Sequence, residues 1–424
     1  MPDGTATAHM LRPKIGTTFQ EGYGLLELKA DALAGLTVAV VALPLSMAIA
    51  VASGVGPERG LATAIIGGFL VSALGGSRFQ IGGPAGAFIV LVAATGAKFG
   101  LEGLLLAVLL SGMMLTLLGL LRLGSLIRHI PHAVTVGFTA AIAVTVLASQ
   151  LKDLGGLTLT GPEPGLLLPK LAALAAAIAT VNPVALSTGV GVAALIFFLR
   201  AARPAWPGML IALAIASILP LVIPGFSLET VGSRFGEIPH GLPAPRLPPI
   251  SWDLVVQVLP AALSFTLLGA VESLLSAKVA DSMTGRVHRS SMELVAQGVA
   301  NMAAPLFGGI CVTGTIARTA TNIRAGARSP LAGIFHALFL LAFIVLAAPL
   351  VAYIPLSALA GVLVVVAWNM AEKPEIARLL REHGSGAAIL ATTFLVTILH
   401  DLTMGIIAGC LVAAGIALVR RARA

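Results

Sequence analysis

The sequence predicts an all-α membrane protein that crosses the bilayer many times. Of its 424 residues, 58% are hydrophobic and only 10% are charged, and the mean hydropathy is +1.00. A soluble domain carries about 25% charged residues, so this composition indicates that lipid surrounds most of the chain. Apolar runs near the length of a spanning helix, roughly 20 residues, follow one another along the sequence.

The predicted segments alternate with short polar connections. A shorter, more polar piece at 314–325 counts as a half-helix and brings the total to about fourteen segments. The stretch 166–181 is expected to lie along the membrane interface, and the Pro- and Gly-rich stretch 225–253 is expected to be an extracytoplasmic loop. The other runs lie near 31–52, 58–76, 84–98, 101–121, 130–150, 182–200, 204–224, 254–280, 290–306, 329–350, 355–371, 386–400 and 403–420.

Lysine and arginine set the expected orientation, because they are enriched in cytoplasmic loops. If the N-terminus is cytoplasmic and the spans alternate, most of the 26 basic residues fall on the inside. This asymmetry predicts an even number of spans in a bacterial inner (plasma) membrane. It also predicts a cytoplasmic N-terminal segment over 1–30 and places both termini in the cytoplasm.

The composition argues against several other classes of protein. The net charge is +8, but the basic residues are scattered singly, which disfavours nucleic-acid binding. Cys311 and Cys410 both lie in apolar context and predict neither a disulfide framework nor a metal cluster. His336 has no companion ligand, so we expect no metal ion and no cofactor. The first 30 residues lack the apolar run of a signal peptide.

Two Gly-rich stretches, 79–87 and 307–315, break the helical pattern at corresponding positions of the two halves. Each leads into a helix start, and Pro84 suits a first turn, where its missing N–H costs nothing. Paired breaks of this kind indicate the central site of a transporter. The free N–H groups of two facing helix starts favour an anion. The alternative is a pair of ordinary glycine turns.

Two ionisable residues are predicted inside the membrane. Arg318 lies about one turn into the second half-helix, and a buried arginine stays charged and needs a partner or an anion. Glu272 lies in the middle of the 254–280 segment without a Lys or Arg within one turn, which makes it the candidate proton-coupling group. The alternative for both residues is a structural ion pair with each other.

Other polar residues of the spans are expected to have structural roles. Glu293, Gln297 and Asn301 recur at i, i+4 and i+8, which predicts a hydrogen-bonded stripe facing the helix bundle. Asp31, at the start of the first run, is expected to cap the N-terminus of that helix. Pro44 is expected to kink the same helix and free a backbone carbonyl near the site.

At these residues the sequence resembles the sulfate permease (SulP) family of anion transporters, as a prokaryotic member. The resemblance covers roughly 31–420, and its motifs are jointly strong. The most specific motif is the run from Gly314 to Asn322, which continues to Pro330. The other matching pieces are Asp31 to Gly35 with Pro44, Gln80 to Ala87, Pro131 to Phe138, and Glu272 to Ser276.

The resemblance implies fourteen transmembrane segments in a 7+7 inverted repeat, with short extended stretches at half-helices 3 and 10. A core (transport) domain would comprise 31–121 and 254–350, and a gate domain would comprise 129–224 and 355–420. Transport would be an elevator-like shift of the core against the gate, in a homodimer. Relatives usually continue into a cytoplasmic STAS domain. We expect this domain to be absent here, natively or by truncation of a longer gene.

The resemblance also implies an anion site between the two half-helices. The substrate-binding residues, carried over by position, would be Leu45, Ser46, Ile49, Pro84, Ala85, Gly86, Thr315, Ile316, Ala317 and Arg318. No residue would be catalytic, because the protein is not expected to be an enzyme. The partners would be a small anion, protons and membrane lipid.

Two departures from the family pattern bear on the substrate. Several relatives carry a polar residue where Leu45 stands and an aromatic residue where Ala85 stands. A roomier, less polar pocket favours a larger anion, so we expect proton-coupled symport of a C4-dicarboxylate such as fumarate. Transport or exchange of sulfate or bicarbonate is the alternative.

Other interpretations of the same sequence are open. An uncoupled anion channel on this fold would produce large single-channel currents. The nucleobase symporters share the architecture but typically place an acidic residue on the tenth helix, where this chain has Arg318. Sodium coupling would require more oxygen ligands than the sequence offers. An intramembrane enzyme would require a nucleophile–base pair, and none is visible.

Overall fold

The computed structural model describes residues 10–124, 131–161, 163–204, 206–222, 228–237, 239–382, 384–400 and 402–423, so the first nine residues of the predicted N-terminal segment lie outside it. Among the described residues, seven helices are long and apolar enough to cross a membrane, and shorter apolar helices of 10–17 residues accompany them. The chain divides into two compact units, Met1–Arg128 with Phe198–Pro355 (unit 1) and His129–Phe197 with Leu356–Ala424 (unit 2). The transport and gate roles of the predicted core and gate domains stay predictions.

Unit 1 contains two sets of elements in the same order, each a long helix, a second helical run, a short strand and further helix. The first set is α3 (Leu25–Ala52), α4 (Pro57–Ala62), η1 (Thr63–Gly67), α5 (Gly68–Leu74), β1 (Gly82–Gly83), η2 (Gly86–Phe88) and α6 (Ile89–Leu120). The second set is α12 (Trp252–Thr284), α13 (Ser290–Ala303), η5 (Ala304–Phe307), β2 (Thr313–Gly314), α14 (Ile316–Arg324) and α15 (Leu331–Val351). The remaining helices of unit 1 are α2 (Lys14–Gln20), α10 (Gly208–Val222) and α11 (Val231–Phe235).

Helix α6 covers most of two predicted spans, 84–98 and 101–121. The helical backbone is interrupted at Gly100, which has φ 69°. Glycine adopts this left-handed conformation without the steric penalty that a Cβ would bring. The interruption therefore lies at the boundary that the sequence predicts between the two spans.

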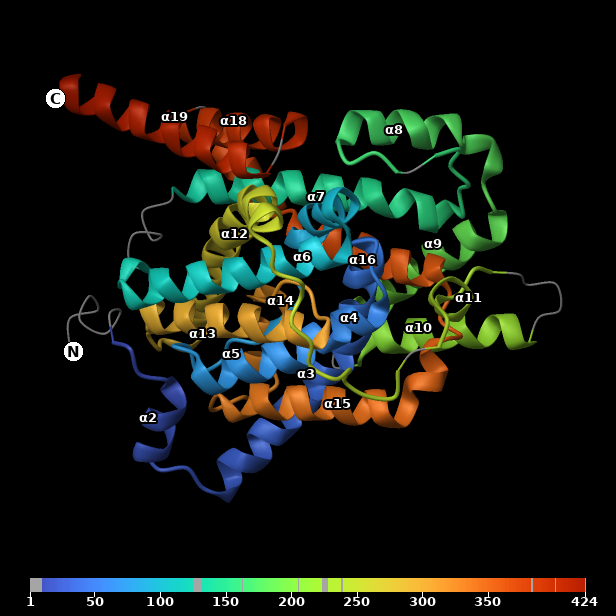
Figure 1. Ribbon diagram of the computed structural model, residues 1–424, viewed down its shortest axis with the longest axis horizontal. Coiled ribbons are helices and arrows are strands. Elements are labelled where there is room, and N and C mark those ends of the chain that lie inside the picture. Colours follow the sequence, from blue (N-terminus) through green and yellow to red (C-terminus); the bar gives the residue numbers. More distant parts are fainter. Residues whose placement is uncertain are drawn as a thin grey trace. The chain divides into compact units, whose positions relative to one another are not determined.

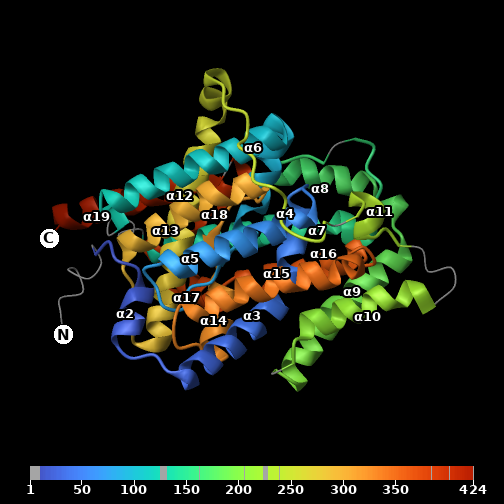
Figure 2. The same cartoon turned by 60° about the horizontal axis from the view of Figure 1, so that its bottom comes forward.

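The helices of unit 1 pack in a repeated pattern. Helix α3 contacts α14 and α15, and α12 contacts α6 and α14. Helix α13 lies between α6 and α5, with α15 next to α5, as Figures 1 and 2 show. The first helix of each set thus packs against the half-helix region of the other set, as an inverted repeat predicts.

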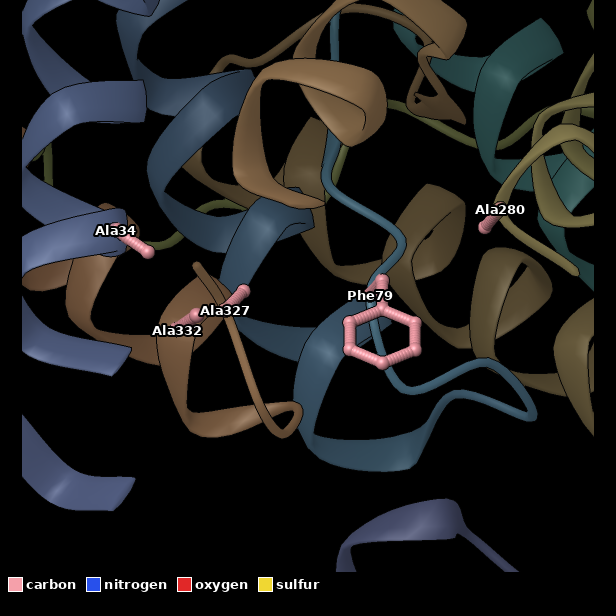
Figure 3. Packing of buried hydrophobic residues seen from close by; sticks show 5 residues of the cluster. All are labelled: Ala34, Phe79, Ala280, Ala327 and Ala332. Carbon is pink, nitrogen blue, oxygen red and sulfur yellow. The ribbon is translucent and has the colours of Figure 1, made fainter. Parts of the chain in front are cut away.

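A small apolar cluster holds the loop that leads into β1. Phe79 packs with Ala34 of α3, Ala280 of α12, and Ala327 and Ala332 near the start of α15. Figure 3 shows the aromatic ring between Ala280 on one side and Ala327 and Ala332 on the other. Small residues allow helices to approach closely in lipid. The alanines leave a space between the helices, and the Phe79 ring fills it.

The polar stripe predicted on 290–306 is confirmed. Glu293 Oε2 accepts a hydrogen bond from the backbone N–H of Ser77 (2.9 Å), and Gln297 Nε2 donates to Glu293 Oε1 (3.1 Å). Asn301 Nδ2 donates to the carbonyl oxygen of Val312 (2.7 Å), and the Val312 N–H donates to Asn301 Oδ1 (2.8 Å). Helix α13 therefore fixes the backbone ahead of both strands.

The predicted role of Asp31 is wrong. Helix α3 begins at Leu25, so Asp31 lies inside the helix and not at its N-terminus. Asp31 Oδ1 accepts from the N–H groups of Arg328 (2.6 Å) and Ser329 (3.1 Å). Asp31 Oδ2 accepts from the hydroxyls of Ser329 (2.5 Å) and Tyr23 (2.8 Å). The fully buried carboxylate joins α3 to the turn that begins α15.

Unit 2 is built around α7 (His132–Gly155), which packs against α16 (Leu356–Met370), α18 (Ser385–Leu399) and α19 (Leu402–Arg423). Gly137 and Gly361 bring backbones together, because an added Cβ would clash with the carbonyl oxygens of Leu390 and Gly189 respectively. The other helices of this unit are α8 (Leu167–Ala176), η4 (Ile178–Thr180), most of α9 (Pro183–Ala202), and α17 (Lys373–Arg381).

We expect Asp31→Ala to lower the free energy of unfolding by about 3 kcal/mol, because the change leaves several buried donors without their acceptor. Thermal unfolding of the detergent-purified protein measures this loss. The matched control is Glu27→Ala, which removes a carboxylate that accepts from the Gly24 N–H (3.0 Å) at the exposed start of the same helix. The control should cost about 1 kcal/mol or less. Equal midpoints for the two variants would contradict the structural role of Asp31.

Candidate functional site

The two interrupted segments meet as an antiparallel pair. Gly82 pairs with Gly314, and Gly83 pairs with Thr313. After the strands, Ala85 (φ −122°, ψ 147°) and Thr315 (φ −108°, ψ 119°) are the extended residues from which η2 and α14 start. The first N–H groups of a helix have no partner within the helix and carry a partial positive charge. The pairing therefore brings two such helix starts to one place.

The backbone of Thr315 and side chains from α14 fix the backbone of the first segment. The Thr315 N–H donates to the carbonyl oxygen of Ile81 (3.0 Å), and the Ile81 N–H donates to Thr319 Oγ1 (3.1 Å). Asn322 Nδ2 donates to the carbonyl oxygen of Phe79 (2.9 Å). Extended backbone inside a membrane needs such partners, because lipid offers none.

A π-helical turn fixes the second segment. Thr63, the first residue of η1, accepts a hydrogen bond at Oγ1 from the Ile310 N–H (2.7 Å) and donates to the carbonyl oxygen of Arg59 (2.6 Å). Arg59 Nη1 donates to the carbonyl oxygen of Gly308 (2.9 Å). Turns of this kind are frequent at functional sites. The segment before β2 is thus held by η1 as well as by Asn301.

Arg318 lies almost fully inside unit 1, with 1% of its surface exposed. Its Nη2 donates to Ser46 Oγ on α3 (3.1 Å), and its Nη1 lies against Gly83, where a Cβ would clash with it. Arg318 Nε and Nη1 have no acceptor, and the guanidinium has no carboxylate partner, among the residues that the structure describes. The ion pair considered as an alternative is therefore not found for Arg318 in that part of the chain.

The structure places most of the predicted substrate-binding residues around these helix starts. The buried residues are Leu45, Ser46 and Ile49 on α3, Pro84, Ala85 and Gly86 ahead of α6, and Thr315 and Arg318 at α14. The first turn of α14 is more open, because Ile316 is half-buried and Ala317 is exposed. A role of these residues in anion binding stays a prediction.

Glu272 lies in the middle of α12 and is 8% exposed. The next residue, Ser273, accepts a hydrogen bond at Oγ from the Gly314 N–H (3.3 Å) and lies 2.9 Å from Thr313 Oγ1. One turn later, Ser276 Oγ donates to Thr319 Oγ1 (3.2 Å). Helix α12 therefore carries this carboxyl group on the turn that supports β2 and α14, and its coupling role stays a prediction.

Two buried polar residues of this region have no role in the sequence analysis. The Gln80 amide lies against Gly314, where a Cβ would clash with it, and its side-chain atoms have no partner among the described residues. His336 of α15 is fully buried beside Gly68, and its ring nitrogens also have no partner among those residues. The feature of the sequence that could have identified these two residues is a polar side chain inside an apolar run. The described residues contain no group of His, Cys, Asp and Glu that could hold a metal ion.

Comparison with known sequences gives one family. The model of the Sulfate permease family matches residues 28–393. The Bacillus subtilis (strain 168) protein named "Putative sulfate transporter YvdB" is 44% identical over 393 residues, which are 93% of this chain and 74% of that protein. The "Bicarbonate transporter BicA" of Picosynechococcus sp. (strain ATCC 27264 / PCC 7002 / PR-6) is 32% identical over 400 residues, with 91% and 69% covered.

A solved structure gives the same result. The transmembrane domain of the cyanobacterium bicarbonate transporter BicA matches this structure with a TM-score of 0.81 at 32% identity, covering 92% of this chain and 98% of that chain. The match confirms the predicted fold class, an all-α polytopic membrane protein with a 7+7 inverted repeat. The chain therefore belongs to the sulfate permease family, whose members are anion transporters and not enzymes.

Proposed function

We propose that this protein is a secondary active transporter that carries a small oxyanion together with protons. The observation that carries the proposal is the buried guanidinium of Arg318, which lies beside two helix starts and has no carboxylate partner among the described residues. A charge at this depth costs several kcal/mol unless an opposite charge compensates it. Each helix start adds about half a positive charge, so an anion between them is stabilised from three directions.

The burial of the site supports a carrier rather than an open channel. Leu45, Ala85 and Thr315 are 7%, 9% and 9% exposed, so solvent reaches the predicted anion position only where the first turn of α14 is open, at Ile316 and Ala317. A carrier closes its site between the two sides of the membrane, whereas a conducting channel needs a continuous path. We propose an elevator-like movement of the core domain for the release of the anion.

Two kinds of oxyanion are candidate substrates. The small side chain of Ala85 and the apolar side chain of Leu45 favour a C4-dicarboxylate such as fumarate. Similarity to proteins named as sulfate and bicarbonate transporters favours those smaller anions. We also propose a homodimer in a bacterial plasma membrane, with both termini in the cytoplasm.

Uptake of labelled fumarate, sulfate and bicarbonate into proteoliposomes, with and without an inward proton gradient, tests the function. We expect saturable, gradient-stimulated uptake of one anion. Arg318→Ala should lower its uptake about 100-fold or more, because the compensating charge is lost. Arg318→Lys should give an intermediate rate, because an ammonium lacks the planar fork of the guanidinium.

The matched control for Arg318 is Arg324→Ala, which removes an exposed arginine from the last turn of the same helix. It should transport at the wild-type rate. Normal uptake by Arg318→Ala would contradict the proposed site. Large currents without saturable uptake would favour the channel interpretation.

Gly83→Ala tests whether transport depends on the observed position of the Arg318 guanidinium. The added Cβ would collide with Arg318 Nη1 and push the guanidinium away from Ser46. Overpacking of this kind costs 1–3 kcal/mol, so we expect uptake to fall about 10-fold or more. Gly191→Ala in α9 is the control, because a Cβ there meets no atom within 4 Å. If both variants transport equally well, Arg318 does not need its observed position.

Glu272→Gln tests proton coupling. The amide keeps the shape of the carboxyl group but cannot bind and release a proton, so uptake should continue while its stimulation by a proton gradient disappears. Glu102→Gln, which changes an exposed carboxylate of α6, should keep the stimulation. Persistent stimulation in Glu272→Gln would show that another group carries the proton.

A further inference from the structure

The N-terminal segment is attached to the rest of unit 1 at a junction of three parts of the chain. The Lys14 N–H donates to the carbonyl oxygen of Gly75 (2.9 Å), and the Arg289 N–H donates to that of Gly76 (2.9 Å). Arg289 Nη1 donates to the carbonyl oxygen of Arg12 (2.7 Å). The start of α2, the loop after α5 and the start of α13 therefore meet here. We call this place the N-terminal junction.

The N-terminal junction carries an excess of positive charge. Glu21 forms ion pairs with Arg78 and with Arg286 (3.4 Å), and Asp281 Oδ2 lies 2.5 Å from His288 Nδ1. The basic residues at the junction are Arg12, Lys14, Arg78, Arg286 and Arg289, and the carboxylates near them are Glu21, Asp281 and Glu293. The carboxylates therefore neutralise only part of the charge.

Several of these cations are withdrawn from water. Arg78 and Arg289 are 8% and 7% exposed, and the Nε atom of each has no acceptor among the described residues. Burial lowers the pKa of Lys14 to about 8, and the charges of Arg289 and Arg78 contribute to the shift. Burial likewise lowers the pKa of Arg289. Withdrawn cations that repel one another are stabilised by an anion.

Exposed apolar side chains flank the N-terminal junction along the chain. Phe19 at the end of α2 is 57% exposed, and Leu25 and Leu26 at the start of α3 are 76% and 80% exposed. Met10 and Leu11, just ahead of Lys14, are also exposed. Apolar side chains next to cations are typical of segments at a membrane surface, where the apolar groups enter the lipid and the cations meet anionic headgroups.

We propose that the N-terminal junction binds the phosphate group of an anionic phospholipid. Lys14 and Arg286 contact the phosphate from the accessible side, and Arg78 and Arg289 supply the buried charge behind it. A free phosphate ion has the same chemistry, but it gives no reason for the exposed apolar side chains beside the site. The bound headgroup holds the N-terminal segment against the rest of unit 1. This inference does not depend on the proposed transport function.

Thermal unfolding of the purified full-length chain in mixed micelles tests the proposal. The probes are phosphatidylglycerol, phosphatidylcholine and inorganic phosphate. Relative to phosphatidylcholine, phosphatidylglycerol should raise the midpoint of the wild type by about 3 °C or more. Lys14→Gln combined with Arg286→Gln should lose this shift. Lys29→Gln combined with Arg328→Gln, which removes two exposed cations elsewhere in unit 1, should keep it.

The pH dependence of the stabilisation by lipid distinguishes a contact with Lys14 from a general attraction of the anionic lipid to positive charge. An anion binds best when Lys14 is protonated, so the stabilisation is present below the pKa of about 8 and falls as pH rises through it. The groups around Lys14 are Arg12, Glu21, Arg78, Asp281, Arg286, His288, Arg289 and Glu293. Lys14→Gln alone should remove the pH step between about pH 7 and about pH 9.5.

Two outcomes would overturn the proposal. Equal stabilisation of the wild type by inorganic phosphate and by phosphatidylglycerol would overturn the lipid assignment and make a soluble phosphate the ligand. Equal shifts in the junction variant and in its control would show that the N-terminal junction binds no phosphate group.

Discussion

The proposed site depends on the pairing of β1 with β2. Extended backbone in a membrane loses water as a hydrogen-bond partner, and each unsatisfied group costs several kcal/mol. Gly82 and Gly83 lie opposite Gly314 and Thr313, and Asn301 satisfies the backbone of Val312 beside the pair. Each segment is extended because the other lies next to it. Neither helix start would keep its position without the opposite repeat.

Gly83 and Gly314 of the strand pair must be glycines, because a side chain from elsewhere in the chain packs directly against each of them. Gly83 leaves space for the guanidinium of Arg318, and Gly314 leaves space for the amide of Gln80. The arginine can therefore pass the strand and reach Ser46 on α3. One missing methyl group at Gly83 thus allows a charged side chain to connect the second half-helix with the first helix of the other repeat.

The features that could be predicted are those with a local signal. Apolar run length predicts the spans, and the i, i+4, i+8 spacing predicts the stripe of Glu293, Gln297 and Asn301. The burial of Arg318 also follows from the placement of 314–325 as a half-helix between apolar runs. Its contact with Ser46, 272 positions away, has no local signal, and only the family resemblance placed the two residues at one site. The same reason accounts for the wrong role of Asp31, because three of its four hydrogen bonds come from Arg328 and Ser329 of the second repeat, whereas helix capping is a local pattern.

The contacts of Asp31 set an order of events during synthesis of the chain. The carboxylate enters with the first long helix, but Ser329, 298 residues later, supplies two of its hydrogen bonds. At about 5–20 residues per second, the ribosome needs about 15 to 60 s to reach that partner. During this interval Asp31 lacks these partners, and of its hydrogen-bond donors in the folded protein only the Tyr23 hydroxyl has been synthesised. Assembly of the first repeat is therefore completed only after the second repeat has been made.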